Sequence, residues 1–208
     1  MLFLGIIVPL SILIPILFCI PKYKIAKVES RLLFYYLIIS GLVNLAALIL
    51  RNYHLTNLPL LHLYTAIEAV FILGYFRCIF EDAVIKKALG AVMIIFPILC
   101  CLNFIFLQRN TFNTYTRPLE AMLITFFCLL HLYKSGFSEN WLKQPTNWFN
   151  AGILIYFPAS FIIFISSNYL ISSTNKTMNT MVWYIHGVLV MVMYFIWARG
   201  FKLIGNGR

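Results

Sequence analysis

The chain alternates long apolar runs with short polar breaks. Each run holds about 18 to 24 residues, close to the roughly 20 apolar residues that a helix needs to cross a bilayer core. The pattern therefore predicts an all-α fold, a seven-transmembrane helical bundle. The expected helices cover approximately residues 2–20, 32–50, 58–80, 88–107, 117–134, 148–171 and 180–203.

The breaks are too short to hold a second domain, so residues 1–208 are expected to form a single integral membrane domain. Run 2–20 is the least regular, because Pro9 and Pro15 are expected to bend or shorten its helix. This run lacks the charged start and the small-residue cleavage site of a signal peptide, which favours a spanning helix.

Composition supports a lipid environment. Hydrophobic residues make up 62% of the chain and charged residues 11%, against roughly 25% charged in soluble domains. The net charge of +10 would suggest nucleic acid in a soluble protein. Here the basic residues stand in short clusters between apolar runs, which is typical of topology signals and of contacts with lipid headgroups. We expect an inner-membrane protein surrounded by membrane lipids, with no nucleic-acid partner.

The distribution of basic residues predicts the orientation. If the amino terminus lies outside, the cytoplasmic segments hold twelve of the sixteen Lys and Arg residues and the outer segments hold four. Basic residues accumulate on the cytoplasmic side of membrane proteins. The pattern therefore favours seven spans, with the amino terminus outside and the carboxyl terminus cytoplasmic. The four outer residues are Arg51, Arg109, Arg117 and Lys176.

The most costly polar residue inside an apolar run is Glu68. It lies ten residues after the start of run 58–80, which at 1.5 Å per residue places it near the middle of the bilayer. Tyr64 and Thr65 precede it by about one turn, and Tyr75 follows by two, so this helix carries a polar stripe that must face the bundle interior. Either the carboxylate binds a proton, cation or ligand, or it fixes helix packing.

Further polar positions fall in the outer half of the predicted helices. His186 lies about six residues inside the outer boundary of the last run. We expect it to pair with a carboxylate, Glu68 first and Glu120 second, and the alternative is a neutral ring bonded to a backbone carbonyl. His62 and Asn44 add to this outer polarity, which is what an outward-facing pocket or ordinary interhelical hydrogen bonding would produce. The predicted ligand- or proton-binding set is Glu68, Tyr64, Thr65, His186, His62 and Asn44.

Arg117 and Glu120 lie three residues apart at the outer end of run 117–134. Residues at this spacing share a helix face, so the sequence predicts an ion pair between them at the membrane interface. Interfacial pairs of this kind contribute little to stability, and the structural interpretation is favoured over a functional one.

The chain lacks the motifs of the common membrane enzymes. It has no HExxH or other metal-ligand spacing, its five cysteines show no CxxC pattern, and no serine stands in a G-x-S-x-G context. We therefore expect no catalytic residue, no metal and no cofactor. A metal centre would require His62, Glu68 and His186 to converge, which leaves a metal-dependent intramembrane hydrolase as the third hypothesis.

Three segments resemble an uncharacterised family of small polytopic membrane proteins from Bacteroidetes-type bacteria. They are HLYTAIEAVFILGYF, FNTYTRPLEAMLITFFCLLHLYK, and NWFNAGILIYFPASFIIF with WYIHGVLV. The resemblance begins at about residue 54 and implies a bacterial sensory or accessory membrane module near signalling proteins. Its matching positions are Tyr64, Glu68, Tyr115, Trp148, Gly152, Tyr156 and His186.

The leading hypothesis is therefore a non-enzymatic sensory or accessory interaction module with an outward-facing polar pocket. Residues 1–208 are expected to hold only membrane helices and short connections, so signalling would require a cytoplasmic or membrane partner at the inner loops or at the basic tail WARGFKLIGNGR. The alternative is a proton- or cation-coupled transporter or channel that uses Glu68.

Overall fold

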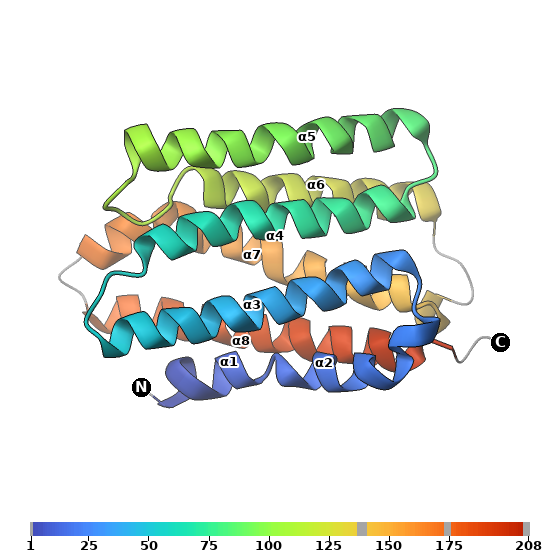
Figure 1. Cartoon of the computed structure of the whole chain (residues 1–208), viewed down its shortest axis with the longest axis horizontal. Helices are drawn as coiled ribbons and strands as arrows, with labels where there is room; N and C mark the ends of the chain where they lie inside the picture. The colour runs from blue at the N-terminus through green and yellow to red at the C-terminus, as the bar shows by residue number, and fades with distance from the viewer. Residues whose placement is uncertain (1, 137–140, 173–175, 206–208) are drawn as a thin grey trace.

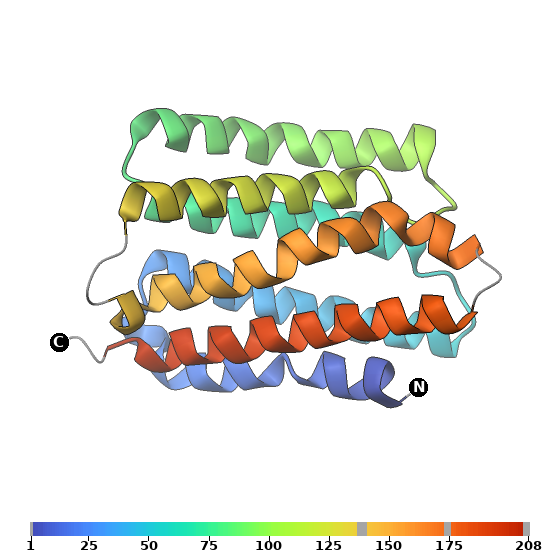
Figure 2. The same cartoon turned by 180° about the vertical axis from the view of Figure 1, so that it is seen from behind.

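The computed structural model describes residues 2–136, 141–172 and 176–205, and within these ranges every regular element is helical. Figures 1 and 2 show an elongated bundle of antiparallel helices. Each of the seven apolar runs forms one long helical segment, as the sequence predicts. The two ends of the chain lie at opposite ends of the bundle (Figure 1).

The first segment is irregular. It consists of η1 (Phe3–Ile7), α1 (Val8–Leu10), α2 (Leu13–Cys19) and η2 (Ile20–Ile25). The predicted bend occurs between α1 and α2, where Ser11 Oγ donates to the Val8 carbonyl at 2.6 Å. Pro15 lacks the N–H group that would bond one turn back, so the backbone cannot continue as an unbroken α-helix.

The remaining helices are more regular and extend the predicted bounds by a few residues at some ends. They are α3 (Val28–Asn52), α4 (Leu58–Ile79), α5 (Ala83–Leu102) continued by η3 (Asn103–Leu107), α6 (Thr116–Ser135), η4 (Trp141–Lys143), α7 (Pro145–Ser172) and α8 (Lys176–Leu203).

The helices form two layers. In Figures 1 and 2, α3 and α4 lie on one side, and α6, α7 and α8 lie on the other. Helix α5 packs against α4 at one edge, and α2 packs against α8 at the opposite edge. A crossing contact between α4 and α6 joins the layers. This contact places the polar stripe of α4 against the first turns of α6.

The core is rich in aromatic side chains. Tyr36, Tyr75, Phe149 and Trp197 are among the largest fully buried residues. The outer surface is apolar as well, with Ile94, Ile98 and Phe106 exposed along α5 and η3. A soluble protein would not expose so many large aliphatic side chains, whereas lipid solvates them.

Six of the long helical segments in the described part of the chain are long and apolar enough to cross a membrane. The exception is α6, which is of similar length but includes Arg117, Glu120, His131 and Lys134. Its polar first turns are buried within the protein instead of facing lipid. The helix is therefore stabilised by its neighbours more than by its own hydrophobicity.

Candidate functional site

A buried cluster of three charges joins α4 to α6. Arg117 Nη1 donates to Glu68 Oε2 on α4 and, at 2.7 Å, to Glu120 Oε2 one turn further along α6. Both glutamates are 1% exposed, and Arg117 is 9% exposed. Because water barely reaches these groups, their mutual attraction is far stronger than that of a surface ion pair.

The second carboxylate oxygen of Glu68 accepts from two tyrosines. Tyr36 on α3 donates to Oε1, and Tyr64 donates to the same atom from one turn earlier on α4 at 3.2 Å. The Tyr64 hydroxyl also lies 3.0 Å from the hydroxyls of Tyr36 and Ser40. These contacts extend the cluster to α3.

Arg117 reaches this depth because its helix begins inside the bundle. Asn113 Oδ1 accepts from the backbone N–H groups of Thr116 and Arg117, at 3.0 and 3.2 Å, and thereby caps the first turn of α6. Asn113 Nδ2 in turn donates to Thr65 Oγ1 on α4 at 3.3 Å. The segment before α6 is thus held against α4, and the guanidinium extends into the core.

Aromatic rings enclose the guanidinium. Arg117 Cζ lies 4.7 Å from the ring centroid of Phe164 on α7 and 5.3 Å from that of Tyr64. Such cation–π contacts are strongest where the cation has lost water. Four helices, α3, α4, α6 and α7, therefore meet at one charged group.

A cavity of about 570 Å³ lies beside the cluster. Its polar lining includes Arg117, Tyr36, Tyr64, Thr65 and His186, whereas Glu68 and Glu120 lie behind these side chains. Its further lining residues come from the first helical segment, α3, α7, α8 and the segment before α6. Those used below are Leu4, Val8, Ser40, Val43, Asn44, Ala47, Arg51, Asn113, Tyr156, Trp183, Val190 and Tyr194.

The cluster holds two carboxyl groups and one guanidinium. Glu120 Oε1 is buried and has no hydrogen-bond partner. A single cation neutralises only one carboxylate, so the second carboxyl needs a proton or another cation to be stable away from water. The arrangement can therefore hold a proton, or respond to a polar group that enters the cavity and binds Arg117.

One predicted pairing is wrong, and another forms in a different environment from the one expected. His186 does not face Glu68: its Nε2 atom lies 3.2 Å from the Tyr156 hydroxyl, and its ring packs on Phe164. Arg117 and Glu120 do form the predicted ion pair, but deep in the protein instead of at the membrane interface. The pair is buried because Asn113, which bonds Thr65 on α4 and the first turn of α6, holds the start of α6 inside the bundle.

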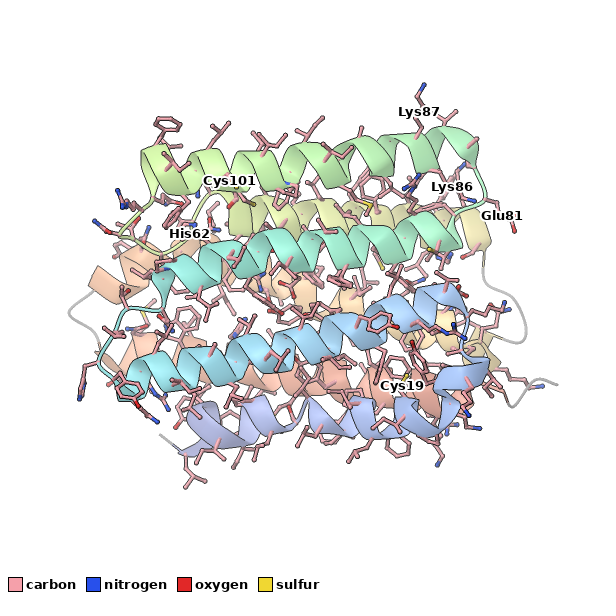
Figure 3. The ribbon with its side chains drawn as sticks, in the orientation of Figure 1. Cys19, His62, Glu81, Lys86, Lys87 and Cys101 are labelled. Atoms are coloured by element: carbon pink, nitrogen blue, oxygen red, sulfur yellow. The ribbon has the colours of Figure 1, made fainter. Side chains whose placement is uncertain are left out.

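The remaining predicted residues separate into two groups. Thr65 and Asn44 line the cavity with Tyr64, although Asn44 is itself exposed. His62 is buried elsewhere, with Nε2 3.3 Å from the Thr111 carbonyl oxygen and its ring beside Phe104. Figure 3 shows His62 near the end of the bundle opposite to Glu81, Lys86 and Lys87.

Sequence reasoning missed Tyr36, Ser40 and Tyr194, whose side chains line the cavity, and found Tyr156 only as a matching position of the family resemblance. A signal existed in α3, where Tyr36 and Ser40 are four residues apart and share a face. Tyrosine is common in membrane helices, however, and its apolar ring conceals the hydroxyl in hydropathy patterns.

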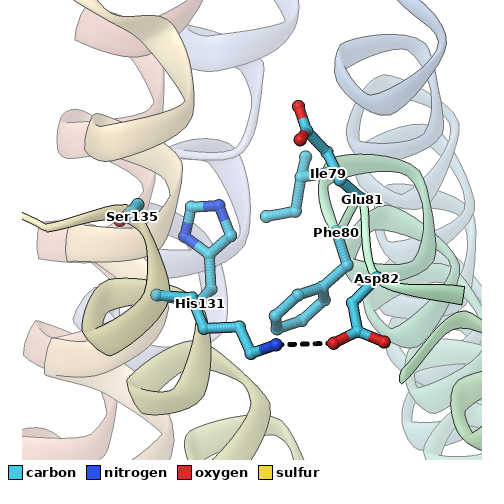
Figure 4. A pocket seen from close by; sticks show the side chains of 7 residues that line it. Ile79, Phe80, Glu81, Asp82, His131 and Ser135 are labelled. Atoms are coloured by element: carbon cyan, nitrogen blue, oxygen red, sulfur yellow. Dashed lines mark hydrogen bonds and ion pairs between the residues drawn. The ribbon is translucent and has the colours of Figure 1, made fainter. Parts of the chain in front are cut away.

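A second cavity, of about 430 Å³, opens at the other end of the bundle. Figure 4 shows His131, Glu81 and Asp82 around it. Lys134 Nζ lies 2.6 Å from Asp82 Oδ2. Asp82 Oδ1 also accepts from Val84 N and Ile85 N at the start of α5. The hydrogen bond from Lys134, followed by the two backbone N–H groups, holds the pKa of Asp82 below its usual range.

A polar chain leads from this cavity into the bundle. His131 Nδ1 lies 3.0 Å from Asn150 Nδ2, and Asn150 Oδ1 accepts from the Tyr75 hydroxyl at 2.8 Å. Between Tyr75 and the charged cluster, Ile72 on α4 and Ile124 on α6 are fully buried. The two cavities are therefore separated by an apolar layer. Among the described residues, no group of three or more His, Cys, Asp or Glu side chains could hold a metal ion.

Comparisons of the chain with protein-family models, with curated proteins and with solved structures found no match. The resemblance to a Bacteroidetes-type family thus stays a prediction, and the functional argument depends on the geometry described above.

Replacing Arg117 tests the charged cluster. The variant Arg117→Met should lose about 3–5 kcal/mol of stability, because it leaves two carboxyl groups buried without their cation. The triple variant Arg117→Met, Glu68→Gln, Glu120→Gln should recover part of this loss, since it removes all three charges together. Unfolding curves in a mild detergent measure both effects. A triple variant no more stable than the single one would contradict the assigned role of the charges.

The pair of Asp82 and Lys134 predicts a pH dependence. Because the pKa of Asp82 is lower in the folded protein, its carboxylate stabilises the fold above its unfolded pKa of about 3.9 and loses this effect as pH falls through the folded pKa. Asp82→Asn keeps a capping oxygen but removes the charge. The difference in melting temperature between wild type and this variant should therefore shrink as the pH is lowered from 7 to 2.5. A constant difference across this range would contradict the prediction.

Proposed function

We propose that this chain is a polytopic inner-membrane protein that binds a small ligand in the 570 Å³ cavity and acts as a non-enzymatic sensory or accessory module. The proposal is based on one observation: Arg117 contacts both the cavity and the two buried carboxyl groups. Its guanidinium lines the cavity, and its Nη1 atom holds Glu68 and Glu120 behind the cavity wall. A ligand that contacts Arg117 thus acts directly on the link between α4 and α6.

The mechanism is a shift between two packings of the bundle. A ligand atom that accepts a hydrogen bond from Nη2 or Nε of Arg117 draws the guanidinium towards the cavity and away from Glu68 and Glu120, which both bind Nη1. The attraction that draws α4 and α6 together then decreases. Such a ligand changes the population of the two packings by the difference of its affinities for them.

The proposal includes an orientation with the amino terminus outside and the cavity open to the outer side. The basic residues support it, and the buried position of Arg117 strengthens the asymmetry by removing one residue from the four counted on the outer side. Termini at opposite ends of the bundle suit an odd number of crossings (Figure 1). The output would pass to a partner protein at the inner end of the bundle.

Transport is the second candidate function. The second cavity and the polar chain of His131, Asn150 and Tyr75 favour transport, because they supply polar groups on the other side of the charged cluster. The layer formed by Ile72 and Ile124 closes this route in the present packing. A receptor needs only one open side, so the geometry supports ligand sensing better than transport.

Reporter fusions test the orientation. A fluorescent protein fused after Arg208 should be bright, because it folds in the cytoplasm, whereas alkaline phosphatase at the same position should be inactive. Insertion of alkaline phosphatase between Thr56 and Asn57, in the connection between α3 and α4, should give an active enzyme. The reverse pattern of activities would contradict the orientation.

A cavity-filling variant tests the binding function. Ala47→Trp places an indole in the cavity, and Leu45→Trp places the same group on the exposed face of α3. Native mass spectrometry of protein taken directly from membranes should find a bound small molecule on wild type and on Leu45→Trp but not on Ala47→Trp.

Spin labels at Glu81→Cys and Ser135→Cys, with Cys78 and Cys101 replaced by serine, measure the distance between the ends of α4 and α6. This distance should differ by about 1–2 Å or more between the ligand-occupied protein and the Ala47→Trp variant.

The results also separate the candidate functions. An empty wild-type cavity, with label distances that are unchanged by Ala47→Trp, would overturn the sensory proposal. Reconstituted vesicles should show no proton flux. Flux that disappears in Glu68→Gln would instead favour the transporter.

A further inference from the structure

We infer that the cavity takes a single-chain anionic amphiphile, with its acid group at Arg51, its apolar body between the first helical segment, α3 and α8, and an uncharged hydrogen-bonding group at Arg117. This inference rests on the proposed function, since it names the ligand class of the same cavity. It follows from the charges, shape and free donors of the lining.

The lining carries positive charge and no negative charge. Its charged residues are Arg51 and Arg117, and it includes no aspartate or glutamate. The charge of Arg117 is already compensated by Glu68 and Glu120. Arg51 is exposed, and among the described residues it forms no ion pair. The uncompensated cation of the cavity is therefore Arg51, and a ligand acid group is most stable beside it.

Arg51 stands at the mouth of the cavity. It lies in the last turn of α3, and its guanidinium faces the start of the chain: a Cβ atom built on Gly5 would lie 3.4 Å from Arg51 Nη2. Arginine offers a planar pair of donors that matches a carboxylate or phosphate. An acid group held here would remain accessible to water at its outer side, which lowers the cost of binding it.

The middle of the cavity is apolar and elongated. One face of α3 lines it from Tyr36 to Arg51, a length of about 22 Å at 1.5 Å per residue. Between these ends, Val43 and Ala47 face Leu4 and Val8 of the first segment and Val190 of α8. A volume of about 570 Å³ lies within the usual range for one small ligand. An extended apolar body therefore fits better than a compact polar one.

The deep end offers donors but rejects a second acid group. Both hydrogen bonds from the Arg117 guanidinium to described residues start at Nη1, so its Nη2 and Nε donors remain for a ligand. The hydroxyls of Tyr156 and Tyr194 line the same end. The charge of Arg117 is already compensated by the carboxyl groups behind it, so this end has no net positive charge to attract an anion. The group that binds at this end is thus an uncharged acceptor such as a hydroxyl, ester or amide oxygen.

The matching probe is 12-hydroxydodecanoate, with a carboxylate and a hydroxyl at opposite ends of an apolar chain. Its controls are 1,12-dodecanediol, which lacks the charge, dodecanoate, which lacks the hydroxyl, and 12-hydroxydodecyltrimethylammonium, which inverts the charge. Binding is measured by calorimetric titration of the full chain in nanodiscs of phosphatidylcholine. We expect the hydroxy acid to bind at least tenfold more tightly than the diol and the ammonium probe, and more tightly than dodecanoate.

Two arginines provide a matched pair of variants. Arg51→Gln should weaken binding of the hydroxy acid at least tenfold without changing the affinity for the diol, whereas Arg51→Lys should retain part of the binding. Arg109→Gln removes an exposed arginine in the segment between α5 and α6 that does not line the cavity, and should have no effect. The water-soluble 6-hydroxyhexanoate distinguishes the sources of the ligand. Binding of this short acid indicates supply from water, and binding of the long acid alone indicates supply from the bilayer.

Failure of the inference differs from failure of the proposed function. Equal or tighter binding of the diol or the ammonium probe, blocked by Ala47→Trp, would overturn the anionic class while the cavity remains a binding site. An equal loss of affinity in Arg51→Gln and Arg109→Gln would also overturn it, because it indicates attraction to the surface charge alone. If no probe binds the wild type and native mass spectrometry finds the cavity empty, both proposals fall.

Discussion

The structure depends on one buried arginine that holds two carboxyl groups. Arg117 connects α4 and α6 through Glu68 and Glu120, and its ring contacts add α7. Glu68 extends the connection to α3 through Tyr36. Each of these groups would be costly alone in a lipid environment, and each glutamate has the arginine as its partner of opposite charge. The helices can therefore pack in few other registers, because any shift would separate a charge from its partner.

The helices themselves could be predicted from the sequence. Seven apolar runs predicted seven helical segments, and even the bend near Pro9 and Pro15 appeared where expected. Hydropathy detects these features because each helix satisfies its own backbone in lipid, so that its length and composition are local properties. The predicted starts were late for some helices, such as α3 and α8, because a helix continues into the polar interfacial region that a search for apolar residues excludes.

The partners of the polar residues could not be predicted in the same way. Glu68 was identified as a buried carboxyl group that needs a partner, and this reasoning did not depend on the fold. The choice of His186 as partner failed because the arrangement of helices decides which side chains meet, and no local pattern encodes that arrangement. Arg117 was placed at the interface because it begins an apolar run. Its true depth is set by Asn113 and Thr65, two small polar residues whose importance appears only once α4 and α6 are packed together.

The limited hydrophobicity of α6 has a consequence for how the protein is made. A helix that carries Arg117 and Glu120 partitions poorly into lipid on its own, so the membrane-insertion machinery would not be expected to release it as an independent unit. Helix α4 precedes α6 in the chain, and its carboxylate is already within the membrane when the arginine arrives. We therefore expect α6 to enter the bilayer as a partner of α4, with the ion pair that later frames the cavity acting first as a signal for assembly.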